Sequence, residues 1–209
     1  MQFMGLHKSP MIVALRSVAS GLAAATLLFH FHTLAQAEVQ RFRLKPEESR
    51  ILTKIKDPFG NIITGSLRVR EGEVSADPDR VKETGMVNLV LLATSYDSDL
   101  GLRDKTVRED YLEVQQYPTI RFSTVEVMKV ERSAPVEKGW KMWVRGTLLL
   151  HGVRKEITVP VEVRDDGKKI AAQGRLQIHL EDFKMVVPSL LFLKAGNQVD
   201  VEFTIIGER

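Results

Sequence analysis

Most of the chain after residue 37 alternates between apolar and polar residues with a period of two, and turn residues divide it into short segments. Such alternation predicts β-strands with one face toward an interior and the other toward solvent. The clearest segment is 140–151, and comparable ones follow at 157–163, 176–180 and 199–205. About eight such strands, linked mostly by short turns, predict an antiparallel barrel or sandwich in one domain.

Four departures from simple alternation predict local features of the sheet. Residues 86–94 are apolar on both faces, which is typical of a strand covered on both sides. The alternation shifts by one residue near Ser123, which predicts a β-bulge. Gly65 lies within an apolar face, where a bulge or a close backbone approach is the usual reason. Pro160 lies on a polar face and indicates a sheet edge or another bulge.

The stretch 102–122 carries the one convincing helical pattern after residue 37. Asp104 is placed to cap a first helical turn and Asp110 to begin a second, so two short helices fit better than one long helix. Pro118 ends the helical region, because the residue before a proline is driven out of the helical conformation. A strand is expected from Thr119 onward. We expect this insert to cover one end of a barrel.

The N-terminal part of the chain has the organisation of an export signal. Lys8 and Arg16 precede an uncharged apolar run at 18–31, and 34–37 is a small-x-small sequence of the kind that signal peptidase cuts. We predict that residues 1–37 are removed as a signal peptide and that the product is periplasmic or secreted. A transmembrane anchor is the alternative, but the run is short and rich in alanine for a membrane span.

The composition excludes several classes of function. The chain has no cysteine, which excludes disulfides, thiolate metal sites and a cysteine-linked lipid anchor. Two of the 30 basic residues lie in the predicted signal, so 28 basic residues face 27 acidic ones in residues 38–209, which is too balanced for a nucleic-acid surface. Of the five histidines, only His151 and His179 lie beyond the signal. We therefore expect no metal and no cofactor.

Ordered motifs along residues 38–209 resemble those of the YceI-like family. They are, in chain order, Ser49 with Gly65, LRD at 102–104 with YLEV at 111–114 and YPTIRF at 117–122, GTLLLHGVRK at 146–155, and GRLQI at 174–178 with Asp182 and Phe183. The resemblance covers essentially all of the predicted domain. It implies a lipocalin-like, eight-stranded extended antiparallel β-barrel with an elongated apolar lumen. It also implies binding of a polyisoprenoid or a similar long lipid outside the cytoplasm.

Two departures from the family pattern concern polar positions. Glu48 and Asp57 occupy places where the family often has histidines. Val107 and Asp110 replace the usual leucine and first aromatic residue of the helix motif. These changes bear on the lipid headgroup and leave the expected fold untouched.

Inward-facing strand positions are the candidates for a lipid-binding lumen. Most are Val, Ile or Leu, and medium-sized aliphatic side chains can leave a channel in an eight-stranded barrel, which is just wide enough for one slim ligand. A dry packed core explains the same alternation and stays open as the alternative. The candidate lumen residues are Leu89, Leu91, Phe122, Trp140, Met142, Val144, Leu148, Val159, Val161, Leu176, Ile178 and Phe203.

Five polar candidates would cap the end of this lumen, namely Arg103, Asp104, Tyr111, Tyr117 and His151. A helix cap with an ion pair is the simplest interpretation of Arg103 and Asp104. A turn between strands is the simplest one for His151, ahead of a catalytic base. Tyr111 and Tyr117 are expected to pack the insert onto the barrel, and a hydroxyl of either could also reach a quinone oxygen or a phosphate.

Together these observations favour an exported, non-enzymatic carrier of an isoprenoid quinone or polyprenyl phosphate, without a stable membrane anchor after cleavage. One alternative is an enzyme that acts on a lipid in the lumen, with His151, Tyr111 or Asp110 as acid or base. Another is a secreted interaction module that uses the apolar loop 188–193 as its contact surface. A homodimer is compatible with each of these functions.

Overall fold

A computed structural model describes residues 38–132, 139–187, 189–190 and 193–209. The predicted signal peptide lies outside the described residues, and so do Pro188 and the tip of the predicted contact loop. In the part of the chain that the structure describes, no helix is long and apolar enough to cross a membrane.

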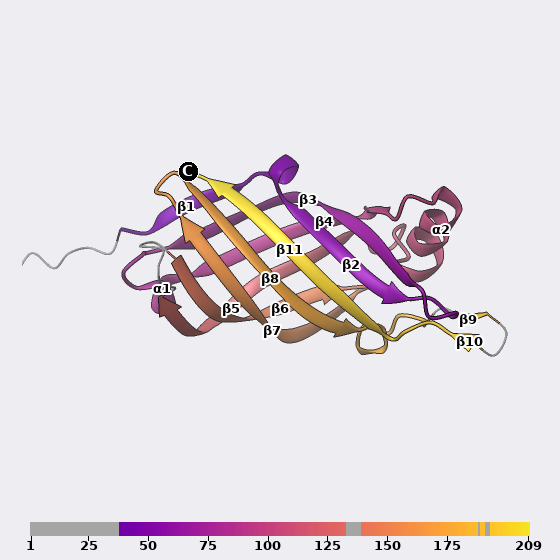
Figure 1. Cartoon of the computed structure of the whole chain (residues 1–209). Coiled ribbons are helices and arrows are strands. Elements are labelled where there is room, and N and C mark those ends of the chain that lie inside the picture. The colour runs from indigo at the N-terminus through magenta and orange to yellow at the C-terminus, as the bar shows by residue number, and fades with distance from the viewer. Residues whose placement is uncertain (1–37, 133–138, 188, 191–192) are drawn as a thin grey trace, which may run out of the picture. The chain divides into compact units, whose positions relative to one another are not determined.

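Eight antiparallel strands close into a barrel (Figure 1). β11 completes the ring, because it pairs with β8 on one side and with β2 on the other. This closure confirms the predicted barrel and excludes the two-sheet sandwich. The barrel strands are β2 (Arg50–Lys56), β3 (Ile62–Ala76), β4 (Met86–Asp97), β5 (Thr119–Arg132), β6 (Gly139–Leu150), β7 (Val153–Asp165), β8 (Lys169–His179) and β11 (Gln198–Glu208).

Two segments share the wall position between β11 and β3. β1 (Gln40–Leu44) pairs with one end of β11 and of β3, while β2 pairs with both strands further along. Between β1 and β2 the chain leaves the wall as a short 3-10 turn, η1 (Pro46–Glu48). The Ser49 hydroxyl stabilises this break, because it donates to the Lys45 carbonyl at 2.7 Å and accepts from the Ile206 amide at 3.1 Å. Ser49 is therefore a structural residue of the first motif.

The bulge predicted near Ser123 and the close approach predicted at Gly65 are present, but 86–94 is not covered on both faces, since Met86 is 54% exposed. The pairing of β5 with β6 shifts after Thr124 and again after Val127, which places two bulges where the alternation changes phase. Gly65 permits a close approach, because a Cβ atom there would overlap the ring of Tyr96. These features set which side chains of β3 to β6 reach the interior.

One part of the barrel wall has no continuous ladder among the described residues. β7 pairs with β6 along almost its full length, but its pairing with β8 covers only Val161 to Asp165. The pairing stops beside Pro160, as expected of a proline at a sheet edge. Residues 153–160 of β7 and 175–179 of β8 thus border a seam, which we name the β7–β8 seam.

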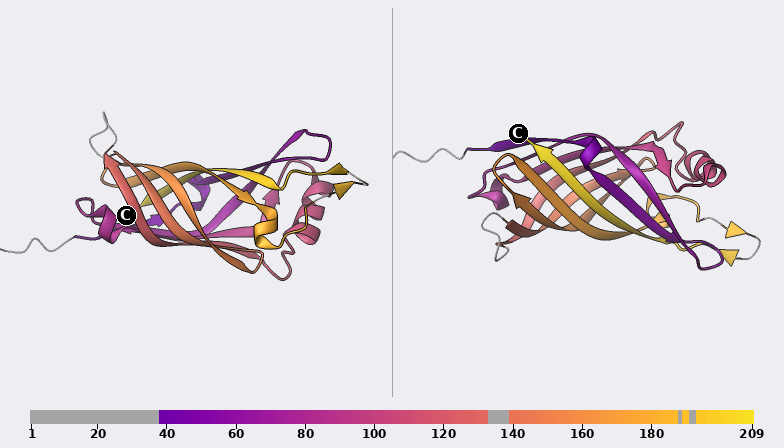
Figure 2. Two further views of the ribbon diagram at one scale, coloured as in Figure 1. Left: turned by 90° about the horizontal axis from the view of Figure 1, so that it is seen from below. Right: turned by 45° about the horizontal axis from the view of Figure 1, so that its top comes forward.

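Helical segments lie at both ends of the barrel (Figures 1 and 2). The end with β1 and the C-terminus carries α1 (Val81–Thr84), and we name it the α1 end. We name the opposite end the α2 end. It carries α2 (Gly101–Thr106), η2 (Val107–Tyr111), η3 (Leu180–Phe183) and a ribbon of β9 (Ser189–Leu190) and β10 (Leu193–Lys194).

The helical insert covers the α2 end as predicted, but its helices begin at other residues. Leu100 is extended, with φ −142° and ψ 97°, and directly precedes α2. Asp104 therefore lies inside α2 and does not cap it. η2, a turn of π-helix, follows α2 without a break, so Asp110 does not begin a second helix. Asp104 has a capping residue's chemistry, but its carboxylate turns back to Ser98. As predicted, a strand begins at Thr119.

Candidate functional site

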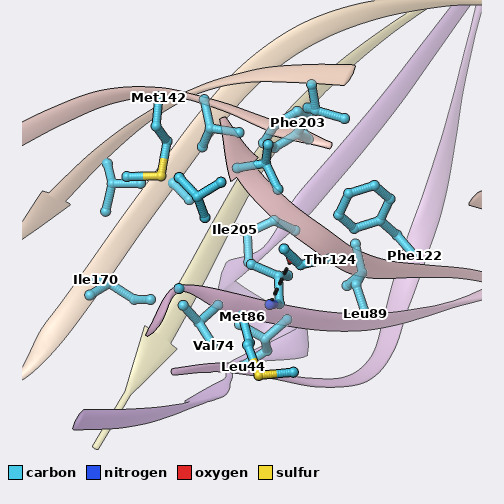
Figure 3. A pocket seen from close by; sticks show the side chains of 18 of the residues that line it. Leu44, Val74, Met86, Leu89, Phe122, Thr124, Met142, Ile170, Phe203 and Ile205 are labelled. Atoms are coloured by element: carbon cyan, nitrogen blue, oxygen red, sulfur yellow. Dashed lines mark hydrogen bonds between the residues drawn. The ribbon is translucent and has the colours of Figure 1, made fainter. Parts of the chain in front are cut away.

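A cavity of about 250 Å³ lies inside the barrel, lined by side chains from β1 and from all eight barrel strands (Figure 3). All twelve candidate lumen residues line it, because successive side chains of a strand point to opposite faces. Phe122, Met142 and Phe203 are the bulky members that Figure 3 labels, and most of the others are aliphatic. Binding of a lipid by these residues stays a prediction.

The wall of this cavity is almost wholly apolar. Its threonine hydroxyls are engaged with backbone, since Thr124 Oγ1 accepts from the Val87 amide at 2.9 Å and Thr53 Oγ1 donates to a β3 carbonyl at 3.3 Å (Figure 3). The carboxylate of Asp165 accepts from the Gly167 amide at 2.7 Å, within its own turn. Such a wall can hold a hydrocarbon chain and offers little to a hydrophilic ligand.

A second cavity, of about 520 Å³, adjoins the first at the α2 end. We name it the mouth. To further apolar residues of the helices and strands, its wall adds the polar side chains of Lys56, Asp57, Tyr96, Arg103, Thr106 and Tyr111. The two cavities therefore share part of their wall, and we name the pair the compartment, with an apolar part and a mixed part. The residues that line both cavities are Thr53, Leu67, Ile120, Leu150 and Ile178.

Ser98 connects Arg103 and Asp104 at the base of α2. Arg103 Nε donates to Ser98 Oγ at 2.7 Å, and another guanidinium nitrogen donates to the Ser98 carbonyl at 2.6 Å. Asp104 is buried and accepts from the Ser98 amide at 2.9 Å and from the Ser98 hydroxyl. Burial raises the pKa of Asp104, but the hydrogen bonds from Ser98 outweigh it and hold the pKa below its ordinary value. Ser98 thus bridges the two charges, where a direct ion pair was expected.

Tyr96 is a mouth residue that the sequence analysis missed. Its side chain is buried against Gly65, and this burial raises the pKa of the Tyr96 phenol. Arg108 on η2 donates to the Tyr96 carbonyl at 2.7 Å, which ties the insert to β4. The glycine predicted that some group would approach closely, but the group could be identified only from the pairing of β3 with β4.

Comparison with known proteins assigns this compartment to a family. The model of the YceI-like domain matches residues 42–206, which is most of the chain. The chain belongs to the YceI-like family. A UPF0312 protein of Vibrio campbellii is 30% identical over 197 residues, which cover 90% of this chain and 95% of the relative.

Two solved structures are similar to this YceI-like domain. BcnA of Burkholderia cenocepacia has a TM-score of 0.63 at 18% identity, and the match covers 78% of this chain and 98% of that one. A polyisoprenoid binding domain from Saccharophagus degradans has a TM-score of 0.59 at 17% identity, with 80% and 97% covered. At these identities the likeness shows the fold alone.

Two motif residues of the YceI-like domain, Tyr117 and His151, lie at the α2 end but line neither cavity. Their rings pack together with centroids 4.7 Å apart. His151 turns the chain between β6 and β7 with a φ of 50°, and its Nδ1 lies 3.2 Å from the Phe183 carbonyl oxygen. Its Nε2 lies 3.5 Å from Glu113 Oε1. The motif GTLLLHGVRK at 146–155 thus contains a stabilised hairpin turn.

The acidic residues at the usual histidine positions of the YceI-like family stabilise a turn and an ion pair here, and Asp57 also lines the mouth. The Asp57 carboxylate accepts from the Asn61 side chain at 2.9 Å and from the Phe59 amide at 2.8 Å, and these hydrogen bonds, the one from Asn61 foremost, lower the pKa of Asp57. Glu48 lies 3.1 Å from Lys169 Nζ. In the described part of the chain, no group of three His, Cys, Asp or Glu side chains could hold a metal ion.

Proposed function

We propose that this protein binds one long-chain isoprenoid lipid, with the tail inside the barrel and the headgroup in the mouth. The observation that carries the proposal is an almost wholly apolar cavity that adjoins a second cavity with polar side chains. The Saccharophagus degradans neighbour is described as a polyisoprenoid binding domain, which supports the same class of ligand here.

Hydrophobic burial is sufficient for such a complex. Transfer of about a dozen methylene-sized groups from water, at ~0.8 kcal/mol each, contributes on the order of 10 kcal/mol before the cost of association. The wall supports this transfer because its threonine hydroxyls already have backbone partners. Few polar groups of the barrel interior therefore have to lose water when the lipid enters.

The headgroup lies beside Tyr96, Arg103 and Tyr111, which line the mouth. Phenol hydroxyls and a guanidinium can donate to a quinone oxygen or to a phosphate oxygen, so both an isoprenoid quinone and a polyprenyl phosphate fit. Arg103 is held in place by Ser98, so its position does not depend on the ligand.

The protein acts as an exported carrier and not as an enzyme in this proposal. Of the three candidate acids and bases, His151 lies outside both cavities, Asp110 is exposed on η2, and Tyr111 lines the mouth. Removal of residues 1–37 on export would place the carrier in the periplasm or the medium.

Native mass spectrometry of protein purified without detergent tests this proposal. The full chain is expressed and recovered in the form in which it accumulates, and bound lipid is extracted and identified. Leu148→Glu places a charge on the cavity wall, while Leu149→Glu is its matched control, since the next residue of a strand faces outward. Circular dichroism confirms that both variants are folded.

We expect an isoprenoid adduct on the wild type and on Leu149→Glu, and its loss from Leu148→Glu. The extract then identifies the headgroup as a quinone or a phosphate. Wild-type protein that carries no lipid and does not bind added isoprenoid quinone would overturn the proposal in favour of a packed core. The function would then be sought on the protein surface.

A further inference from the structure

Exposed apolar side chains gather around the mouth. Phe59 and Ile62 in the β2–β3 hairpin are 67% and 66% exposed, Leu100 and Leu102 at the start of α2 are 52% and 82% exposed, and Val186 after η3 is 67% exposed. The hairpin, α2 and the segment after η3 lie at the same end of the barrel (Figures 1 and 2). We name these five residues the apolar collar.

The collar is continuous with the cavity. Phe59 and Leu102 line the mouth and are also exposed to solvent. Val186 follows Met185, which is buried and lines the mouth. An apolar surface therefore runs from the barrel interior, through the mouth, onto the outside of the α2 end.

Packing of the barrel does not explain the collar. Leu102 is the most exposed large apolar residue of the described chain, and it lies on a helix whose buried residue is Asp104. Exposed apolar surface that is grouped around a cavity opening marks an interaction site more often than scattered apolar residues do. Four other large apolar residues are exposed in the described part of the chain, and they lie on other elements, namely Val39, Met86, Val125 and Met128.

We propose that the apolar collar docks the α2 end onto a lipid bilayer. Its side chains enter the boundary between headgroups and acyl chains, and the mouth then faces the bilayer interior. This inference rests on the proposed function, because an isoprenoid tail resides in a bilayer and could pass into the barrel without crossing water. The continuity of collar, mouth and cavity is what favours a bilayer over a protein partner.

Charge plays a small part in this docking. Acidic and basic side chains alternate around the collar. On the helical insert, Lys105 Nζ lies 3.9 Å from Glu109 Oε2, and in the β2–β3 hairpin Lys56 and Asp57 are neighbours in the sequence. We therefore expect similar binding to neutral and to anionic vesicles, with little dependence on salt.

Flotation with phosphatidylcholine vesicles, with and without phosphatidylglycerol, tests the docking. The collar variant is I62S/L100S/V186S, because none of these three residues lines a cavity. The matched control is V39S/V125S/M128S, which removes three exposed apolar residues that lie away from the mouth and line neither cavity. The full chain is expressed in each case, so any effect of the N-terminal residues is common to all samples.

We expect the collar variant to lose vesicle binding by at least about tenfold, while the control floats like the wild type. Equal flotation of the two variants, or loss of flotation in high salt, would overturn the inference. A wild-type dimer that becomes a monomer in the collar variant, with no flotation of either, would assign the collar to a second copy of the chain instead.

Binding of dissolved farnesol, measured by native mass spectrometry, separates this inference from the proposed function. Wild type that binds farnesol but does not float would overturn the docking and leave the proposed function in place. Wild type that floats through its collar but binds neither farnesol nor a longer isoprenoid would support the docking surface and overturn the proposed ligand.

Discussion

The two ends of the barrel differ in how they are filled. At the α1 end, Val81 of α1 packs with Val127, Trp140 and Met142 in an apolar cluster that lines the cavity there. At the α2 end, polar side chains line the mouth and the apolar collar surrounds it. Because one end of the lumen is apolar and the other is mixed, the two ends favour different parts of an amphipathic ligand. A long ligand of this kind is expected to enter through the mouth with its tail first.

The largest expected effect on stability comes from the α2 end. Phe183 is fully buried in the larger core cluster, so Phe183→Ala should lower the free energy of unfolding by about 3–5 kcal/mol. Val81→Ala at the α1 end removes two methyl groups and should cost about 2 kcal/mol. Denaturant titration of both variants measures the difference. If both substitutions lowered the free energy of unfolding equally, the two ends would contribute equally to stability.

A block inside the barrel tests the direction of the lumen. Ala172 lines the cavity in the half toward the α1 end, where its cross-strand partners are Val163 of β7 and Ile205 of β11. Ala172→Phe should weaken binding of long isoprenoids by at least about tenfold, since each excluded methylene costs ~0.8 kcal/mol, and should spare farnesol. Ala171→Phe, which points outward, is the control. If Ala172→Phe weakened binding of farnesol and of long isoprenoids equally, the headgroup would not lie in the mouth as proposed.

The buried carboxylate of Asp104 at the base of α2 should make the stability of the α2 end depend on pH. Asp104→Asn leaves the Ser98 bridge without a charged acceptor and should lower the free energy of unfolding at neutral pH by about 1–3 kcal/mol. Because the folded pKa of Asp104 is lowered, its contribution is complete above the ordinary pKa of 3.8 and is lost as the pH falls through the lower folded value.

Denaturant titrations of wild type and Asp104→Asn at a series of acidic pH values measure this contribution. The two curves should converge as the pH falls below 3.8. A constant gap between them down to the lowest pH would show that the carboxylate is not held in its charged form by Ser98.

The smallest effect is expected at His151. Asparagine adopts positive φ readily and is favoured in two-residue hairpin turns, so His151→Asn should offset the lost contact with Phe183 and change stability by less than about 1 kcal/mol. Lipid binding measured by native mass spectrometry should not change, because His151 lines neither cavity. Loss of the adduct would place the lipid outside the described compartment.

The barrel and the inward faces of its strands could be predicted from the sequence alone. The period of two links the position of a residue to the face it occupies, so Leu148 and Val159 could be assigned to the interior without knowledge of the partner strands. The resemblance of its ordered motifs to the YceI-like family then implied a barrel where the alternation alone left a sandwich open. The alternation also predicted the bulge near Ser123 and the close approach at Gly65.

Contacts that depend on the path of the chain between elements could not be predicted in the same way. Asp104 was interpreted as a helix cap because capping is a local pattern, whereas its actual partner, Ser98, precedes the helix and is set by the path of β4. Tyr96 was missed for the same reason. The alternative contact surface at 188–193 stays untested, because its side chains lie outside the described part of the chain. The apolar collar is formed by residues of three separate segments that only the closed barrel brings to one end.

The β7–β8 seam has a consequence for the width of the barrel. In a fully laddered barrel, the girth is fixed by strand number and register, and expansion must break hydrogen bonds. Along residues 153–160 of β7 and 175–179 of β8, no ladder bonds between the described strands oppose a small outward movement. Widening along this line would therefore break side-chain contacts and no ladder hydrogen bonds of the described strands, so the seam is where the wall is expected to yield first to a thicker ligand.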